Sequence, residues 1–153
     1  MQNTVNISYV NSKSKDIYDQ GLQYATIGSL GLDLRACIEQ DITIKAGERI
    51  AINTGIRIEI LKEDVGAFIY SRSGLGAKQG IVVAQGVGVI DKDYRGEIIV
   101  VLLNTSDNDY TIIKGERIAQ MLFQQAYQLK VIETDILNET ERGSGGFGHS
   151  GKI

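Results

Sequence analysis

The sequence predicts an all-β fold, a jelly-roll-like distorted barrel with at most one or two short helical turns. Two observations carry this prediction. Many short apolar stretches at strand spacing are separated by glycine-containing turns, a pattern typical of sandwiches and barrels. In addition, no stretch shows helical periodicity over more than two turns, and residues 131–141 are the best candidate for a helix. Because proline is absent and glycine occurs 18 times, glycine must supply most of the turns.

The predicted strands follow one another along most of the chain. Residues 5–10 alternate apolar and polar side chains, whereas residues 11–20 are polar and are expected to form a loop. Residues 56–60 alternate cleanly, and residues 98–103 are apolar throughout, which predicts a strand buried on both faces. One helical turn is expected within residues 71–78. The other expected strands cover residues 30–34, 42–44, 49–52, 66–70, 110–113, 117–123 and 128–133.

Residues 80–97 are the stretch around which the chain is organised. Their two apolar arms flank a turn that contains Gly86 and Gly88, which predicts a β-hairpin. A glycine has no Cβ, so a flat ligand can approach the backbone of this turn closely. Asp91 and Tyr94 follow at once, which places a candidate base next to a recognition surface. The alternative is a tight hairpin with a solvated, charged exit.

A short internal repeat supports the predicted architecture. The sequence GERIA occurs at residues 47–51 and again at residues 115–119. We interpret both copies as hairpin turns that feed a strand, because a jelly roll places such turns in related positions.

Length and composition limit the class of protein. A chain of 153 residues suggests one domain, and a net charge of −3 argues against nucleic acid held by general electrostatics. A single nucleotide, whose phosphates need only a few local cations, stays possible. The lone Cys37 excludes an internal disulfide, and no signal peptide or membrane-spanning apolar run is found. The reducing cytoplasm is therefore the expected location.

Several side chains are candidates for chemistry. The stretch 71–74 combines serine hydroxyls with Arg72 and predicts an anion site, the alternative being an N-capped surface turn. Asp33 and Asp91 each lie within an apolar frame, which suggests oriented carboxylates, although a turn-capping aspartate is also common. The single histidine, His149, and the lone cysteine provide no zinc cluster. A metal would be held by oxygen ligands and phosphates, which indicates Mg²⁺.

The glycine-rich end of the chain is predicted to lack regular structure. We divide the chain into a β domain over residues 1–140 and a flexible C-terminal segment over residues 141–153. This segment carries Arg142 and one large apolar residue, Phe147, and suits a lid that orders over a ligand. The alternative is a frayed terminus.

Taken together, these stretches resemble the trimeric dUTP pyrophosphatase (dUTPase) family over nearly the whole chain. Five motifs occur in the family's order and spacing, at residues 29–34, 72–76, 88–96, 115–120 and 142–148. The departures are few. Ser71 stands where a proline is usual, Leu30 where a small residue is usual, and Gln85 where the uracil-binding turn often carries asparagine.

The resemblance implies a jelly-roll homotrimer whose three active sites are each assembled from all three chains. It implies hydrolysis of dUTP to dUMP and pyrophosphate with Mg²⁺, which limits uracil in DNA and supplies dUMP for thymidylate synthesis. Asp91 would be the general base that deprotonates the water attacking the α-phosphorus. Asp33 would reach Mg²⁺ through water. The residues implied for substrate binding are Arg72, Ser73, Gly74, Gln85, Gly86, Val89, Ile90, Tyr94, Ile99, Gln120, Arg142, Phe147, Ser150 and Gly151.

The resemblance also implies a role for each group of these residues. Backbone groups of residues 85–90 would pair with the uracil edge, and Tyr94 would lie under the deoxyribose and exclude a 2′-hydroxyl. The phosphate-binding residues would be Arg72, Ser73, Gly74 and Gln120. In the C-terminal segment, Phe147 would stack on the base, and Arg142, Ser150 and Gly151 would take the γ-phosphate.

Two other functions stay open at this point. A dCTP deaminase shares the superfamily fold but is disfavoured by the string Ile90–Asp91–Lys92–Asp93–Tyr94, which looks like the pyrophosphatase. A non-catalytic nucleotide-binding domain is disfavoured because a candidate base, phosphate donors and a lid are all present.

Overall fold

A computed structural model describes residues 3–146 of the chain, which form eleven strands and two short helices within that range. In chain order these are β1 (Val5–Tyr9), α1 (Ser12–Ile17), β2 (Leu32–Arg35), β3 (Ile42–Ile44), β4 (Arg49–Asn53), β5 (Ile56–Ile60), β6 (Val65–Tyr70), α2 (Ser73–Gln79), β7 (Ile81–Val83), β8 (Gly88–Ile90), β9 (Ile99–Asn104), β10 (Tyr110–Ile112) and β11 (Arg117–Gln125). The predicted all-β fold with at most two short helical segments is confirmed.

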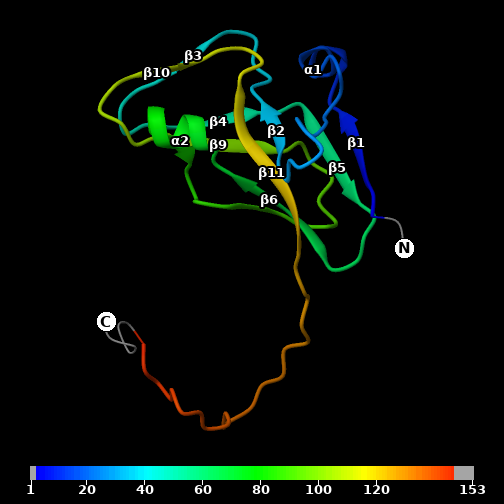
Figure 1. The fold of residues 1–153 in the computed structure, drawn as a ribbon, viewed down its shortest axis with the longest axis vertical. Helices are drawn as coiled ribbons and strands as arrows, with labels where there is room; N and C mark the ends of the chain where they lie inside the picture. The colour runs from blue at the N-terminus through cyan, green and yellow to red at the C-terminus, as the bar shows by residue number, and fades with distance from the viewer. Residues whose placement is uncertain (1–2, 147–153) are drawn as a thin grey trace.

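The strands pair into small antiparallel sheets that wrap around one core (Figure 1). The largest has the order β2–β11–β6–β8, and a second has the order β4–β9–β7. Two further pairs, β1–β5 and β3–β10, complete the barrel. Most partners are far apart in the sequence, as expected for a jelly roll.

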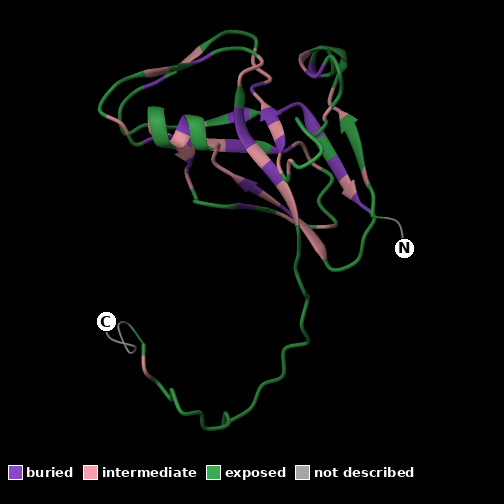
Figure 2. Cartoon of the chain, viewed as in Figure 1, coloured by how far each residue is buried: buried purple, intermediate pink, exposed green. Residues whose placement is uncertain are grey.

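Residues from all these sheets, most of them aliphatic, form one buried core cluster. Figure 2 colours the buried residues purple. Strand β5 shows the predicted alternation, since Ile56, Ile58 and Ile60 are buried. The prediction for β9 was wrong for the chain taken alone. Leu102 is buried, but Ile99 is 48% exposed, so the core covers one face of this strand. The reason is that the β4–β9–β7 sheet has the core on one side only.

The predicted hairpin at residues 80–97 does not form as a paired ladder. Strand β7 pairs with β9, whereas β8 pairs with β6, so the two arms belong to different sheets. The turn at residues 84–87 therefore carries the chain from one sheet to the other. An apolar–glycine–apolar pattern satisfies either kind of pairing, which is why the sequence could not distinguish them.

The two GERIA turns are likewise corners between sheets. Strand β3 pairs with β10, while β4 and β11 pair elsewhere. Gly47 and Gly115 have the same left-handed φ of 77°, which glycine adopts without strain. The glutamate after each glycine accepts a hydrogen bond from the turn backbone: Glu48 from the N–H of Lys45, and Glu116 from that of Ile113. The repeat thus encodes two equivalent corners, as the sequence suggested, but not two hairpins.

Two local predictions need correction. The segment expected to be a loop contains α1, because Asn11 accepts a hydrogen bond from the Ser14 N–H at 2.9 Å and caps the helix. Neither the strand expected at residues 128–133 nor the helix considered at 131–141 is present. Residues 126–146 leave the barrel as an extended segment (Figure 1). Within the described residues, no strand pairs with this segment.

The helices of the described residues, both less than three turns long, are too short to cross a membrane.

Candidate active site

Three neighbouring strands bring candidate phosphate-binding residues together. In the register of the largest sheet, Gln120 of β11 lies opposite Asp33 of β2 on one side and Tyr70 of β6 on the other. Arg72 follows two residues after Tyr70. The sheet itself therefore gathers Asp33, Arg72 and Gln120, which lie far apart in the sequence.

An ion-pair cluster organises this region. The Nε of Arg72 lies 2.8 Å from Oδ1 of Asp33, and an Nη of Arg117 lies 3.4 Å from Oδ2 of the same carboxylate. Arg72 also donates a hydrogen bond to the backbone carbonyl of Arg117 at 3.2 Å. Because the Asp33 side chain is 25% exposed, water screens these pairs only in part. Asp33 thus holds both guanidinium groups at the sheet surface.

Arg117 was missed by the sequence reasoning. In a regular strand, residues three apart point to opposite faces, so Arg117 and Gln120 should not share a surface. A register shift between Arg117 and Ala119 adds a bulge to β11, and this brings Arg117 to the Asp33 side. Alternation in the sequence contains no signal for such a bulge.

Gln120 is fixed by two neighbours. Its Nε2 donates a hydrogen bond to the carbonyl of Ser71 at 3.0 Å. Gly31 leaves the space for its amide, since a Cβ at position 31 would come within 2.6 Å of Oε1 of Gln120. Gly31 of the first motif, which has no side chain, therefore leaves room for the side chain of Gln120 in the fourth motif.

Ser73 and Gly74 follow Arg72 in the sequence. They begin α2 and are exposed. No heavy atom lies within 4 Å of the position that a Cβ on Gly74 would occupy. The backbone there is open to a ligand, and the anion site stays a prediction.

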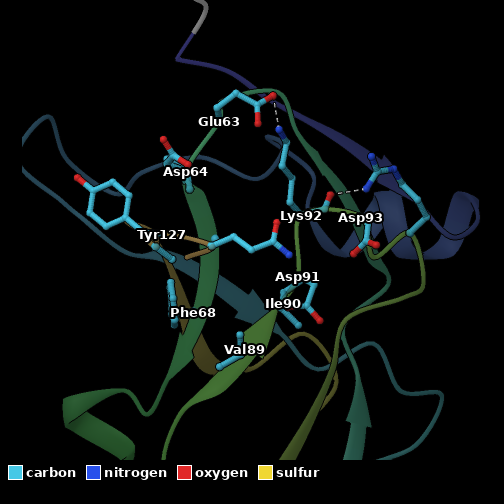
Figure 3. A pocket seen from close by; sticks show the side chains of 14 residues that line it. Glu63, Asp64, Phe68, Val89, Ile90, Asp91, Lys92, Asp93 and Tyr127 are labelled. Atoms are coloured by element: carbon cyan, nitrogen blue, oxygen red, sulfur yellow. Dashed lines mark hydrogen bonds and ion pairs between the residues drawn. The ribbon is translucent and has the colours of Figure 1, made fainter. Parts of the chain in front are cut away.

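Asp91 lies directly after β8, which pairs with β6 through Ile90 and Ala67. It is exposed and lines a cavity of about 760 Å³ (Figure 3). Phe68 and Val89 form an apolar part of the lining, and Lys92 at the rim makes an ion pair with Glu63. The cavity thus presents a carboxylate beside an apolar floor.

Tyr94 is held in place by its own loop. Its hydroxyl donates a hydrogen bond to the carbonyl of Glu97 at 2.9 Å, and its ring folds over Gly96. A Cβ at position 96 would collide with the ring. Tyr94 is 42% exposed, so part of the residue is accessible to a ligand.

The comparisons with known proteins agree with this arrangement. The dUTPase family model matches residues 18–151. A deoxyuridine 5'-triphosphate nucleotidohydrolase of Desulfitobacterium hafniense is 46% identical over 147 residues, which cover 96% of this chain and 95% of that protein. The chain belongs to the dUTPase family. The resemblance inferred from the five motifs is therefore confirmed.

Solved dUTPase structures share the fold. A variant of the dUTPase of Staphylococcus bacteriophage 80alpha, solved with dUpNHpp, is 22% identical and superposes with a TM-score of 0.83 over 98% of this chain and 99% of that one. A variant of the dUTPase from phage phi11 of S. aureus, whose structure concerns the coordination of a structural Mg(II) ion, is 16% identical, with a TM-score of 0.75 over 90% of this chain and all of that one. At these identities the likeness establishes the jelly-roll-like dUTPase fold.

A single chain of this dUTPase does not bring all the predicted site residues together. Asp91, Val89 and Ile90 line the large cavity, but Arg72 and Gln120 do not. Ile99 lies in the β4–β9–β7 sheet and is exposed. Arg142 lies in the extended C-terminal segment, where its Nε donates to the carbonyl of Gly145 at 2.9 Å. The predicted residues that lie outside the described part of the chain are Phe147, Ser150 and Gly151.

Proposed function

We propose that this chain hydrolyses dUTP to dUMP and pyrophosphate. Membership of the dUTPase family supports the substrate and the reaction class. The observation that carries the proposal is the cluster of Arg72, Arg117 and Gln120 around Asp33 on a sheet whose edge strand, β8, leads directly to Asp91. Guanidinium and amide donors bind phosphate oxygens, and a carboxylate on the same sheet can accept a proton from water.

The base would be read by the turn between β7 and β8. Gln85 and Gly86 are exposed, and Gly86 has a left-handed φ of 79°. The Gly86 N–H already donates to the Val83 carbonyl at 3.0 Å, so the base would pair with other backbone groups of the turn. Pairing of these groups with the uracil edge selects against cytosine, whose donors and acceptors are reversed and would leave polar groups unpaired. Exposed Val89 and Ile99 supply apolar contact, and Ile90 continues the turn backbone.

The sugar would rest on Tyr94. Its hydroxyl is already engaged by the Glu97 carbonyl, which fixes the ring as a flat surface. A 2′-hydroxyl on the substrate would meet this surface, so a ribonucleotide would be disfavoured.

Asp91 would act as the general base. It is exposed beside the cavity and free to accept a proton from a water molecule aligned with the α-phosphorus. The water would attack in line, and pyrophosphate would leave with the charge held by Arg72, Ser73, Gly74 and Gln120.

The residues present fit a magnesium ion that is held mainly by the substrate. Within residues 3–146, no group of three or more acidic, histidine or cysteine side chains is placed to bind a metal. Asp33 offers a hard oxygen donor, and a carboxylate has acceptor capacity beyond its two arginine partners. Asp33 would therefore contact the ion through water. When bound, Mg²⁺ would neutralise charge on the phosphate oxygens.

A homotrimer with shared active sites is part of the proposal. The exposed face of β9, which includes Ile99, is apolar and uncovered in the single chain. The extended C-terminal segment exposes further large apolar side chains, namely Tyr127, Leu129, Val131, Ile132, Ile136 and Leu137. Apolar surface of this extent marks contact with other chains. The proposed β domain and lid (1–140 and 141–153) follow the same logic, with Arg142, Phe147, Ser150 and Gly151 closing over a neighbour's site.

The remaining proposals concern the cellular role. Hydrolysis of dUTP would limit uracil in DNA and supply dUMP for thymidylate synthesis. Cys37 is free, which fits the proposed cytoplasmic location.

Pyrophosphate release from dUTP, with Mg²⁺ and with a chelator, tests the proposal directly. We expect rapid release with the metal and strong selection for dUTP over dCTP and dTTP. Ammonia release from dCTP would instead indicate a deaminase. Nucleotide binding without any product would indicate a non-catalytic domain.

A further inference from the structure

Both ends of the turn that we assign to base recognition are held by the same short stretch of chain. At its far end, Gly88 is paired with Ile69 of β6. At its near end, the backbone N–H of Val83 donates a hydrogen bond to Oγ of Ser71 at 2.8 Å. Ile69 and Ser71 are two residues apart, so they set the separation of the two ends of the turn.

The amide of Val83 has no acceptor in its own sheet. The neighbouring Ala84 N–H donates to the carbonyl of Val101 in β9 at 2.9 Å. Successive N–H groups of an antiparallel strand point to opposite sides, so the Val83 N–H points away from β9. Strand β7 is the last strand of its sheet, and the Ser71 hydroxyl supplies the acceptor at this open edge. This bond bridges the two sheets between which the turn crosses.

Ser71 also belongs to the phosphate-binding region. Its carbonyl accepts the hydrogen bond from Nε2 of Gln120, and Arg72, Ser73 and Gly74 follow it directly. One half-buried serine therefore contacts the base-binding turn through its side chain and the phosphate-binding residues through its backbone. A proline, the residue usual at this position in the family that the motifs resemble, has no hydroxyl and could not make the bond to Val83.

We propose that Ser71 is a positioning residue that sets the base-binding turn (residues 84–87, with its ends at Val83 and Gly88) against the phosphate-binding segment (residues 72–74). The proposal rests on the proposed function of these two regions. It predicts that the hydroxyl acts on recognition of the base and leaves the binding of the phosphate chain unchanged.

Ser71→Ala is the first test, because it removes the acceptor and keeps the backbone that Gln120 contacts. We expect KM for dUTP to rise about ten-fold, since an unpaired backbone donor is costly, while kcat changes less than about three-fold. The inhibition constant of dUMP should rise by a similar factor. Inhibition by inorganic tripolyphosphate, which has no base, should be unchanged.

Two further variants make the test specific. Ser71→Thr keeps a hydroxyl and should restore the KM for dUTP. Thr105→Ala is a matched control, because the Thr105 hydroxyl bonds to the carbonyl of Gly80 at 2.8 Å at the start of β7, away from the turn. It should leave the KM for dUTP and the inhibition by dUMP as they are in the parent.

Hydrogen exchange of the Val83 amide, measured without nucleotide, tests the bond itself. Exchange should be slow in the parent and in Ser71→Thr, and faster in Ser71→Ala. This readout does not depend on the reaction, so a parent that failed to hydrolyse dUTP would refute the proposed function while the bond could still be tested. Equal losses of dUMP and tripolyphosphate binding in Ser71→Ala, or no loss of either, would overturn the positioning role. So would unchanged exchange at Val83.

Discussion

Replacing Gly31 with alanine should impair phosphate binding through Gln120. The new Cβ would come within 2.6 Å of Oε1 and 3.2 Å of Cβ of Gln120, and within 3.3 Å of Cδ1 of Leu122. The nearest of these atoms is the end of a flexible side chain, so the Gln120 amide is expected to swing away. Its hydrogen bond to the Ser71 carbonyl would then be lost.

The size of the effect follows from these contacts. Loss of one partly buried hydrogen bond costs about 1 kcal/mol, and small shifts at the two tighter contacts bring the loss of unfolding free energy to about 1–2 kcal/mol. Loss of the proposed contact between Gln120 and a substrate phosphate should lower kcat/KM for dUTP about ten-fold, which corresponds to roughly 1.4 kcal/mol of transition-state stabilisation.

The assay compares two glycines of the same loop. Gly28→Ala is the matched control, because no heavy atom lies within 4 Å of its added Cβ and its φ is outside the left-handed region. Pyrophosphate release and urea unfolding should be close to those of the parent for this variant, with a stability gain of up to about 1 kcal/mol.

A double-mutant cycle shows whether Gly31 acts through Gln120. In a Gln120→Ala background, adding Gly31→Ala should cause no further loss of activity, because the side chain it displaces is gone. Additive losses would refute the reasoning. So would a Gly31→Ala enzyme that is as active as Gly28→Ala.

Three other predictions test the proposed site and the fold. Asp91→Asn should lower kcat for dUTP about 10²- to 10⁴-fold, because the amide of the new asparagine cannot accept the proton. The melting temperature should be unchanged, because Asp91 is exposed. Activity within a few-fold of the parent would rule out Asp91 as the base. A chain ending before Arg142 should lose turnover but keep its melting temperature, and mixing it with Asp91→Asn chains should restore pyrophosphate release if sites are shared. Two inactive parents that stay inactive after subunit exchange, or a monomer in sedimentation, would contradict the trimer. Burial, and then the hydrogen bond to Glu116, raise the pKa of Tyr110 to about 12 from 10.0. The neutral phenol is therefore favoured in the folded state, so its contribution to stability is complete below pH 10 and is lost between pH 10 and about 12. The stability difference between parent and Tyr110→Phe, from urea unfolding, should shrink across this range, and a constant difference would argue against it.

The sequence by itself determined the fold class and the family. Short alternating stretches such as residues 56–60 predict strands because side chains alternate between core and solvent, and this holds in β5. The five motifs predicted a dUTPase because each keeps its reactive side chains and its glycines together over a few residues. Asp33, Arg72, Gln120 and Asp91 were all named in this way.

Tertiary structure decided which strands pair and which residues meet. The sequence of the two arms around Gly86 is also compatible with a hairpin. In the structure β7 pairs with β9 and β8 pairs with β6, so each arm has its partner elsewhere in the sequence. Arg117 reaches Asp33 only because a bulge in β11 shifts its side chain to that face. The hydroxyl of Ser71 accepts a hydrogen bond from the backbone N–H of Val83, which belongs to a different sheet. Local patterns record the preference of each residue for core or solvent, whereas pairing and bulges depend on contacts between distant segments, which no local pattern contains.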